Sequence, residues 1–171
     1  AKDRPHITDR LLFRHWNEWR ERKRSHLLRV PATGGAVVDL TPGDRDVPPF
    51  DRGSAEDFGV SPDGKEIYFV AVSDAVEAIS TNGDIYVVPA GGGKPKQLTS
   101  HGGWDGMPRP SPDGNWIAWR SQPRAGYEAD RMRLIVSKRD GSGVRELTTG
   151  FELSVDQLFW ADGGKKLRFT A

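Results

Sequence analysis

The tetrapeptide Ser-Pro-Asp-Gly occupies residues 61–64 and recurs 50 residues later at residues 111–114. A degraded copy, Ala-Asp-Gly-Gly, occupies residues 161–164, after another 50. Each copy is followed, three residues on, by an apolar side chain; these are Ile67, Ile117 and Leu167. A fixed period of this length indicates a repeat architecture, in which one small structural unit stacks on the next.

The tetrapeptide has the composition of a tight turn between two strands. Proline presets φ for the second position of a type I turn, and aspartate tolerates the third position. Glycine adopts the left-handed conformation that a bulged hairpin needs. We therefore assign a structural role in turns to the following residues: Ser61, Pro62, Asp63, Gly64, Ser111, Pro112, Asp113, Gly114, Gly163 and Gly164.

The end of the unit also recurs, as the dipeptide Leu-Thr at residues 40–41, 98–99 and 147–148. Each unit then reads as four short strands joined by turns. The second and third strands are apolar on both faces, as in residues 67–70 and 134–136, whereas a sheet with one face in water alternates apolar and polar residues. Burial on both faces is expected when four-stranded sheets stack side by side around an axis. The sequence therefore predicts an all-β fold, a β-propeller.

We expect residues 1–171 to be part of one β-propeller domain with about three four-stranded, WD-like blades: a partial blade, two full blades and a partial blade. Expected strands near 10–16, 26–30 and 36–40 form the first blade, residues 56–99 and 106–148 form the full blades, and the last copy supplies two strands. The expected blade boundaries lie near residues 42–55, 100–105 and 149–154. Because closed propellers have about 4–8 blades, we expect an interior piece of a longer protein, whose total blade number and origin stay open.

The composition limits the possible partners. The chain has 25 Lys and Arg against 24 Asp and Glu, a net charge of +1, without the basic surplus of a nucleic-acid-binding domain. It has no cysteine, which excludes disulfides, thiolate zinc sites and a cysteine nucleophile. No apolar run approaches the ~18 residues that span a bilayer. We expect neither nucleic acid nor a membrane as a partner.

The motifs of catalytic and cofactor sites are missing from the sequence. A serine hydrolase of the α/β type needs a Gly-x-Ser-x-Gly elbow, and Ser142, between two glycines, instead matches the turn at residues 91–92 of the preceding unit. The Gly-Gly-Gly-Lys run at residues 91–94 lacks the spacing of a phosphate loop. The histidines show no zinc spacing; they are His6, His15, His26 and His101. We expect no catalytic residue, metal or cofactor in this chain.

The repeat, written Ser-Pro-Asp-Gly-x-x-Ile/Leu-x-Phe/Trp and followed by Gly-x-x-x-Leu-Thr, resembles the blades of the prolyl oligopeptidase family and of the Tol-system periplasmic propeller. Residues 11–19 with 23–27, and residues 121–131, resemble bacterial dipeptidyl aminopeptidase and acylaminoacyl peptidase enzymes. The resemblance covers nearly the whole chain. It implies the non-catalytic propeller of a serine exo- or oligopeptidase, which gates the access of short peptides to a separate α/β-hydrolase domain absent from this chain.

The resemblance leaves several points open. Dipeptidyl, acylaminoacyl and prolyl specificity all remain possible, and the alternative function is a stand-alone propeller that binds proteins, like the Tol-system protein. The expected partners are short peptide substrates of the parent enzyme, its own hydrolase domain, and a second copy of the chain bound through open blade edges. The compartment stays open between bacterial periplasm and cytoplasm, with a slight preference for the periplasm.

The loop expected between the second and third strands of the unit at 106–148 carries the candidate substrate contacts. They are Tyr127, Glu128, Asp130 and Arg131. An aromatic ring, two carboxylates and an arginine can grip a peptide terminus or dock a neighbouring domain. The alternative is a structural loop closed by salt bridges. Dipeptidyl peptidases of the resembling kind hold the substrate amino group with propeller carboxylates, but this chain has no adjacent Glu-Glu pair of that type.

Overall fold

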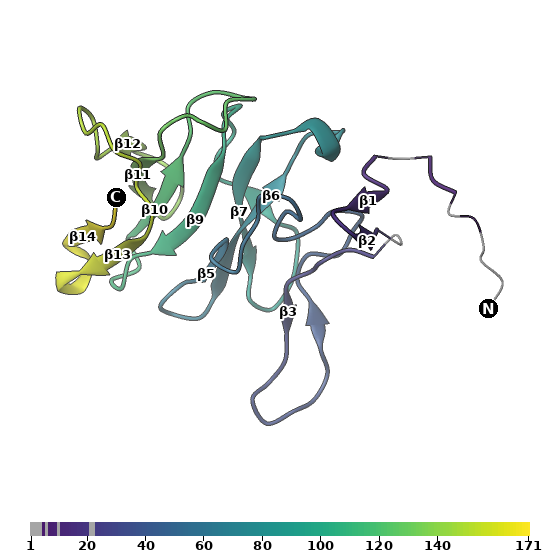
Figure 1. Ribbon diagram of the computed structural model, residues 1–171. Helices are drawn as coiled ribbons and strands as arrows, with labels where there is room; N and C mark the ends of the chain where they lie inside the picture. Colours follow the sequence, from purple (N-terminus) through teal and green to yellow (C-terminus); the bar gives the residue numbers. More distant parts are fainter. Residues whose placement is uncertain (1–4, 6, 10, 21–22) are drawn as a thin grey trace.

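A computed structural model describes residues 5, 7–9, 11–20 and 23–171, and this part of the chain is all-β (Figure 1). Two antiparallel four-stranded sheets form its centre. The first has the order β5 (Phe58–Val60), β6 (Glu66–Val72), β7 (Gly83–Pro89) and β8 (Lys96–Gln97). The second contains β9 (Asp105–Pro110), β10 (Trp116–Ser121), β11 (Arg133–Lys138) and β12 (Arg145–Glu146), in sequential order. The predicted all-β fold is confirmed.

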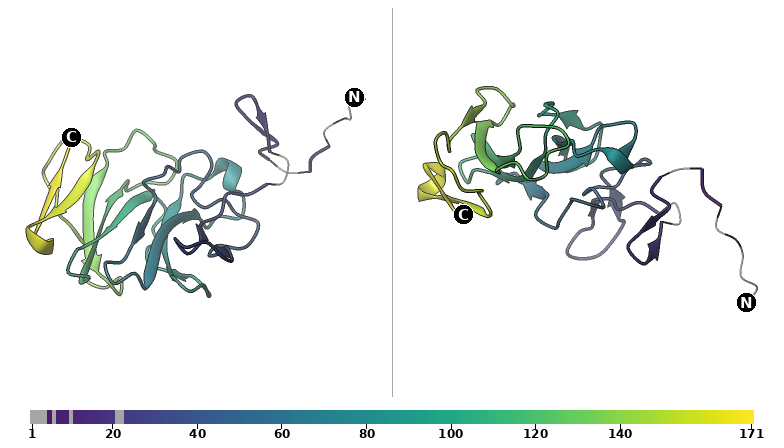
Figure 2. Two further views of the ribbon diagram at one scale, coloured as in Figure 1. Left: turned by 90° about the horizontal axis from the view of Figure 1, so that it is seen from below. Right: turned by 45° about the horizontal axis from the view of Figure 1, so that its top comes forward.

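Three two-stranded sheets complete the described chain. They pair β1 (Arg14–His15) with β2 (Glu18–Trp19), β3 (Leu28–Arg29) with β4 (Val38–Asp39), and β13 (Leu158–Ala161) with β14 (Lys166–Phe169). Two 3₁₀ turns, η1 (Glu77–Ile79) and η2 (Asp162–Gly164), lie in the connections. Successive sheets stand side by side along the chain (Figure 2).

The predicted strand at residues 10–16 is wrong in its length and its place in the first unit. Among the described residues 11–16 the strand comprises Arg14–His15 alone, and it pairs with β2 rather than with the strand near residues 26–30. Trp16 has a φ of 48°, which lets the chain reverse at once. The segment before β3 is held instead by Asp46, whose carboxylate accepts hydrogen bonds from the Ser25 amide at 2.9 Å and from Arg24 Nη1 at 2.9 Å.

The first two predicted turns share one hydrogen-bond pattern. The Gly64 and Gly114 amides donate to the carbonyl oxygens of Ser61 and Ser111 at 2.8 and 2.9 Å. Both glycines are left-handed, with φ of 68° and 72°, as a residue without Cβ allows. Each serine hydroxyl also donates to the aspartate two residues later and accepts a backbone N–H from five residues later. The serine therefore joins both ends of the turn.

The third turn keeps the pairing of its strands but not the hydrogen bonds of its tip. Trp160 pairs with Leu167 just as Val60 pairs with Ile67 and Pro110 with Ile117. Ala161 stands at the serine position and has no hydroxyl. The turn is instead the 3₁₀ segment η2, with left-handed φ at Asp162, Gly163 and Gly164.

Apolar side chains fill the space between successive sheets in three clusters. Residues 50 apart contribute to consecutive clusters: Ile67 packs on the first, Ile117 lies in the second and Leu167 packs on the third. Ile117 is buried, and Ile67 and Leu167 are half-buried. The first cluster contains Leu40, Val47, Phe69, Ala71 and Val88. The second contains Tyr68, Val70, Ile85, Trp104, Ile117, Trp119 and Ile135. The third contains Met107, Ala118, Leu134, Val155 and Leu158.

Polar bonds cross the same gaps between sheets. The buried Asp57 carboxylate accepts the Met107 amide at 2.8 Å, which fixes the first strand of one sheet to the preceding sheet. Trp160 Nε1 donates to the Arg109 carbonyl at 2.7 Å across the next gap. Arg139 donates to Glu66 at 2.8 Å, and Glu66 also accepts the Tyr68 hydroxyl at 2.7 Å. The stack is therefore held by apolar contacts within each gap and by polar bonds at its borders.

Close packing at Gly83 gives a direct test of the second cluster. A Cβ at this position would lie 2.4 Å from Trp104 Cε3, so Gly83→Ala must displace a buried indole. We expect it to lower the free energy of unfolding by about 1–3 kcal/mol, as overpacking does. The measurement is the urea midpoint. Gly91→Ala is the matched control, because its Cβ would meet no atom within 4 Å, and equal midpoints for the two variants would contradict the packing described.

Candidate functional site

The Leu-Thr dipeptides close each sheet at the end that carries the loops between second and third strands. Each leucine amide donates to a backbone carbonyl of the third strand at 2.8 to 2.9 Å. The following threonine hydroxyl accepts the N–H of that same third-strand residue at 2.9 to 3.0 Å. The threonines are Thr41, Thr99 and Thr148, and their partners are Leu27, Ile85 and Leu134. The backbone groups at this end are thus satisfied.

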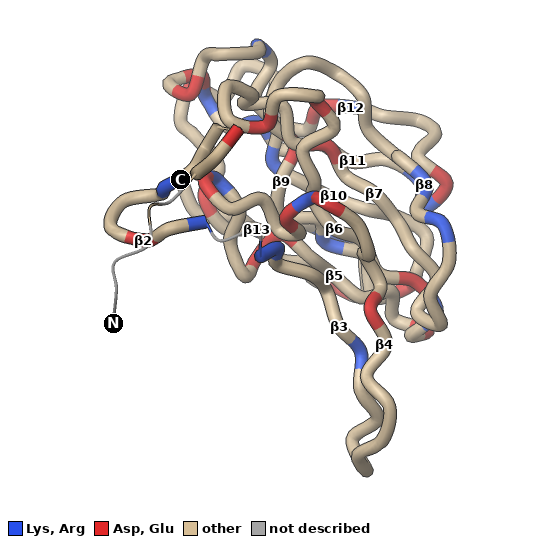
Figure 3. Tube along the Cα trace, turned by 90° about the vertical axis from the view of Figure 1, so that its right-hand side faces the viewer, with Lys and Arg blue, Asp and Glu red and all other residues tan. Residues whose placement is uncertain are grey.

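A polar side-chain pair lies beside each of these threonines. His26 Nδ1 is 2.7 Å from Asp39 Oδ2, and Gln97 Nε2 donates to Asp84 Oδ2 at 2.9 Å. In the next sheet the Glu146 carboxylate accepts from both Arg131 and Arg133, at 3.1 and 3.5 Å. Acidic and basic residues are interspersed along the chain (Figure 3). We call this end of the stack the loop face.

The loop of residues 122–132 on the loop face is tied down by Gln122. The side-chain amide of this buried glutamine donates to the carbonyls of Glu128 and Asp130 at 2.8 and 2.7 Å. Its oxygen accepts Arg52 Nη2 at 2.8 Å. The Gly126 amide donates to Thr81 Oγ1 at 2.7 Å, across to the neighbouring sheet's loop. The loop is therefore anchored at its base and beside its tip.

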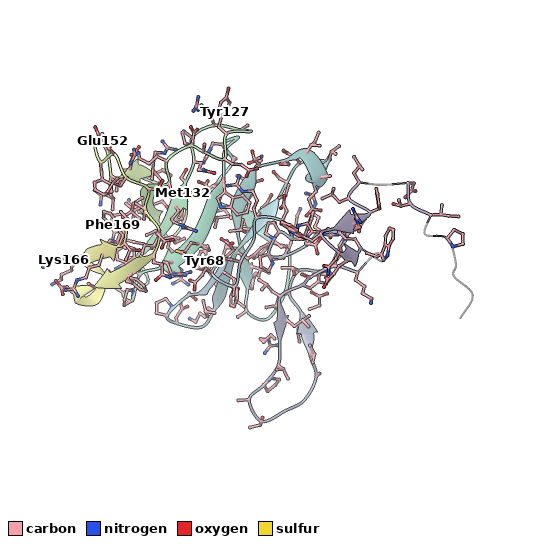
Figure 4. The ribbon with its side chains drawn as sticks, in the orientation of Figure 1. Tyr68, Tyr127, Met132, Glu152, Lys166 and Phe169 are labelled. Atoms are coloured by element: carbon pink, nitrogen blue, oxygen red, sulfur yellow. The ribbon has the colours of Figure 1, made fainter. Side chains whose placement is uncertain are left out.

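Two of the predicted contact residues are joined through Arg124, which the prediction did not include. The Arg124 guanidinium lies over the Tyr127 ring, 4.0 Å from its centroid, and its Nε donates to Asp130 Oδ2 at 2.8 Å. The hydrogen bond from Arg124 lowers the pKa of the Asp130 carboxyl below its ordinary value. Tyr127 is 55% exposed and lies at the outer end of the molecule (Figure 4).

The other two predicted residues differ in their surroundings. Arg131 is half-buried and donates to Glu146 Oε1 at 3.1 Å and to the Thr148 carbonyl at 3.3 Å. Glu128 is exposed, and within the described chain no side chain binds its carboxylate. Arg131 therefore holds the loop to the sheet, while Glu128 is available to a ligand. Arg124 and Asp130 both lie in the quoted stretch 121–131, but their spacing of six residues in a loop does not by itself indicate an ion pair.

A second polar cluster surrounds His101 between the two four-stranded sheets. Its Nε2 lies 2.8 Å from Asp105 Oδ1 and 3.1 Å from Ser121 Oγ, and its Nδ1 accepts the Gly103 amide at 3.0 Å. Asp105 Oδ1 also accepts Trp119 Nε1 at 2.9 Å. The hydrogen bond to Asp105 raises the pKa of His101 above its ordinary value, although burial opposes the shift.

These residues include a serine, a histidine and an aspartate, but their geometry is not that of a hydrolase triad. In a triad the serine and the aspartate bind different nitrogens of the imidazole. Here both lie at Nε2, and Nδ1 is occupied by a backbone amide. Ser142 is exposed in the turn between β11 and β12, where its amide donates to Asp140 Oδ1 at 2.9 Å. Neither serine is arranged as a nucleophile.

A cavity of about 700 Å³ lies at the other end of the described chain, between the N-terminal segment and η1. Its wall includes Phe50, over whose ring Arg20 lies at 3.7 Å, and Arg24, whose Nε is 2.9 Å from Asp44 Oδ1. Glu77 also lines it, and burial raises the pKa of this carboxyl, with a further contribution from the charge of Asp46. Its wall thus combines aromatic, cationic and acidic groups.

Among the residues that the structure describes, no three His, Cys, Asp or Glu side chains are grouped so as to hold a metal ion. In the same part of the chain no helix has the length and apolar character needed to cross a membrane.

The His101 cluster predicts a pH dependence of stability. A folded-state pKa above the unfolded value contributes stability that is present in full below the unfolded pKa of about 6.5 and is lost as the pH rises through the folded value. We expect His101→Gln to lower the free energy of unfolding at pH 5 more than at pH 8. Urea unfolding between pH 5 and pH 8 measures this difference. In the Asp105→Asn variant, which lacks the carboxylate, the loss caused by His101→Gln should not depend on pH. If the loss of unfolding free energy in His101→Gln instead grows with pH, the Gly103 amide keeps the His101 imidazole neutral and the prediction is wrong.

No protein-family model matches the chain. Curated relatives do match it, and the first is dipeptidyl-peptidase 5 of Porphyromonas gingivalis, 35% identical over 173 aligned positions that cover 96% of this chain and 25% of that protein. Dipeptidyl-peptidase 5 of Porphyromonas endodontalis is 37% identical over 76% of this chain and 20% of that protein. The chain thus spans about a quarter of the length of the curated relatives it matches.

A solved structure described as TolB, from Agrobacterium tumefaciens, superposes with a TM-score of 0.54 and 22% identity, over 85% of this chain and 56% of that one. At this identity the likeness concerns the fold alone, and it agrees with the stacked sheets described above. The chain is therefore a homologue of dipeptidyl-peptidase 5 over about a quarter of that protein's length, and the fold of this quarter is a segment of a β-propeller.

Proposed function

We propose that the chain is the non-catalytic propeller region of a serine exo- or oligopeptidase of the prolyl oligopeptidase type. In this role it gates the access of short peptides to a separate α/β-hydrolase domain. The observation that carries the proposal is the match to dipeptidyl-peptidase 5 along 96% of this chain but only 25% of that protein. Neither Ser121 nor Ser142 is arranged as a nucleophile.

The gating acts by shape and charge. Sheets buried on both faces form a rigid wall, and the loop face borders the opening with anchored loops. An extended peptide passes such an opening, whereas a folded protein does not. The exposed Glu128 carboxylate binds the cationic amino group of a peptide, and Tyr127, held by Arg124, contacts its side chains. Asp130 and Arg131 keep their own ion-pair partners and position the loop.

The proposal predicts an effect of Glu128→Gln on substrate binding in a peptidase that contains this chain. Because one exposed charged contact is lost, we expect KM for dipeptidyl nitroanilides to rise about threefold to fivefold while kcat is unchanged. The control is Glu152→Gln, an exposed glutamate on a different loop (Figure 4). The isolated chain serves as the blank without a hydrolase domain. Equal KM values for both variants and wild type would remove Glu128 from the substrate path.

The second candidate function is a stand-alone propeller that binds other proteins; the likeness to the TolB structure concerns the fold and is compatible with both functions. The two functions differ in the reading frame after residue 171. A Gly-x-Ser-x-Gly followed by Asp and His supports the peptidase. Another blade and a stop codon supports the binding module.

We also propose that the isolated chain associates with a second copy through β14. Within the described residues β14 pairs with β13 only, and an unpaired strand edge is a template for pairing. Phe159 and Phe169 on this hairpin are 55% and 38% exposed. The face of another copy's first sheets, which carries the exposed Leu28 and Val37, supplies an apolar partner.

If the chain associates in this way, its apparent mass in light scattering should rise with concentration. We expect Phe169→Lys to reduce this rise. Burying apolar surface is worth roughly 25 cal/mol per Å², so a charged side chain at the contact should raise the dissociation constant at least about tenfold. Lys166→Glu is the control for a charge change on the same strand, because that side chain is 70% exposed. A monomer at every concentration would contradict the contact.

A further inference from the structure

Five Asp-Gly dipeptides occur in the chain, and three of them stand in the 50-residue repeat. They begin at Asp63, Asp105, Asp113, Asp140 and Asp162. An aspartyl carboxyl can react with the backbone amide nitrogen of the next residue, and glycine leaves that nitrogen sterically open. The nitrogen attacks Cγ of the neutral carboxyl, one water leaves, and a five-membered succinimide forms. Water then opens either carbonyl, which regenerates aspartate or gives isoaspartate, so no other reactant is needed.

In the first two turns of the repeat both reacting groups are engaged. The attacking nitrogens, those of Gly64 and Gly114, donate to serine carbonyls at 2.8 and 2.9 Å. The Asp63 carboxylate accepts from Ser61 Oγ at 2.6 Å and from the Lys65 amide at 3.1 Å. Its pKa is lowered to about 2, chiefly by the Ser61 hydroxyl. The pKa of Asp113 is likewise lowered, chiefly by the hydroxyl of Ser111.

The remaining protected pairs lie in ordered backbone. The Gly141 amide donates to the Lys138 carbonyl at 2.9 Å, and Asp140 accepts the Ser142 amide. Asp105 is fully buried in β9, where Gly106 pairs with Arg120. The one Asn-Gly dipeptide, at residues 82–83, ends in the buried first residue of β7, against Trp104. Ring closure at these sites requires local unfolding of a sheet or a turn.

The third turn lacks the hydrogen bonds that hold the aspartate carboxylate and the glycine amide in the first two turns. Ala161 has no hydroxyl, and Asp162 stands where the first two turns have proline, one residue before the aspartate that the serine binds in those turns. The 3₁₀ bond of this turn runs from the Lys165 amide to the Asp162 carbonyl at 3.3 Å, and among the described residues none accepts the Gly163 amide. Among the described residues the Asp162 carboxylate has one partner, the exposed Lys166 ammonium at 2.8 Å, and such surface pairs bind weakly. Asp162 is also the one aspartate of the five with a left-handed φ, 51°.

We propose that Asp162–Gly163 is the site in this chain at which spontaneous succinimide formation converts aspartate to isoaspartate. The inference concerns the folded chain and does not depend on the proposed function. The product adds one methylene to the backbone inside the tip that joins Ala161 to Lys166, the last pair of the β13–β14 hairpin. Gly164 in this tip packs beside Asp113, 3.0 Å from where a Cβ would lie. The lengthened tip therefore loosens the contact between the third and second turns.

The experiment measures succinimide turnover at every Asp-Gly pair in one sample. The folded chain is kept in H₂¹⁸O near pH 6 at 37 °C, since each ring opening incorporates one ¹⁸O whether aspartate or isoaspartate results. Digestion with trypsin in ordinary water then gives peptides for residues 53–65, 97–120, 140–145 and 146–165, and fragmentation of peptide 97–120 in the mass spectrometer separates Asp105 from Asp113. Because hydrogen bonds engage both the carboxylate and the attacking amide at Asp63–Gly64, we expect at least about tenfold more ¹⁸O in peptide 146–165 than in peptide 53–65.

Two variants test whether the serine hydroxyl of the turn protects the aspartate. Replacing Ala161-Asp162-Gly163 by Ser-Pro-Asp restores the motif of the first two turns, and the aspartate then at position 163 should take up several-fold less ¹⁸O than Asp162 of the wild type. Ser111→Ala removes the hydroxyl that binds Asp113 and should raise uptake at residue 113, and its strand pairing should persist because the third turn keeps that pairing with alanine at this position. In 6 M urea the three repeat sites should react at similar rates. Equal uptake in the folded chain would overturn the proposal, and so would a difference that persists unchanged in urea.

Discussion

The packing of apolar side chains between neighbouring sheets is the constraint on which the rest of the structure depends. Side chains alternate along β6, so Phe69 faces the preceding sheet and Tyr68 faces the following one. A sheet of this kind has no solvent face of its own and is stable only between neighbours. Each buried apolar side chain contributes about 1.5–3 kcal/mol, far more than an exposed ion pair. Loops and turns are therefore free to vary as long as the two faces remain apolar.

Polar bonds between sheets determine the rotation and offset that the apolar contacts leave open. Apolar packing is non-directional, whereas the bond from the Met107 amide to Asp57 and that from the Trp160 indole to the Arg109 carbonyl each fix one atom of a sheet to one atom of the next. Both connect residues about one repeat apart in sequence. Relative placement of the sheets, and with it the spacing of the loops on the loop face, follows from these few bonds.

Much of the fold could be predicted from the sequence because the repeat states the same local signals three times. Each unit shows turn glycines, apolar second and third strands and a Leu-Thr ending. Each of these signals indicates a short strand or a tight turn, so together they left few alternatives to an all-β repeat fold. The first unit was harder, because the segment before β3 is held by contacts of Arg24 and Ser25 with Asp46, more than 20 residues away in sequence. The candidate loop was located from sequence, but the central position of Arg124 was not. A side chain six residues from its partner reveals its role only once the loop is closed by Gln122.

The repeat also separates what a fold requires from what a local sequence adds. All three hairpins keep the same strand pairing, with and without the serine, so the pairing is set by strand packing rather than by the turn. The serine instead determines the chemistry of the tip: with it, one hydroxyl binds the aspartate and one backbone amide, and the tip is ordered. Without it, at Ala161, the chain forms the 3₁₀ turn η2. The left-handed conformation then begins at Asp162, a residue with a side chain, and continues through Gly163 and Gly164. Architecture and chemical durability are thus encoded by different residues of the same short motif.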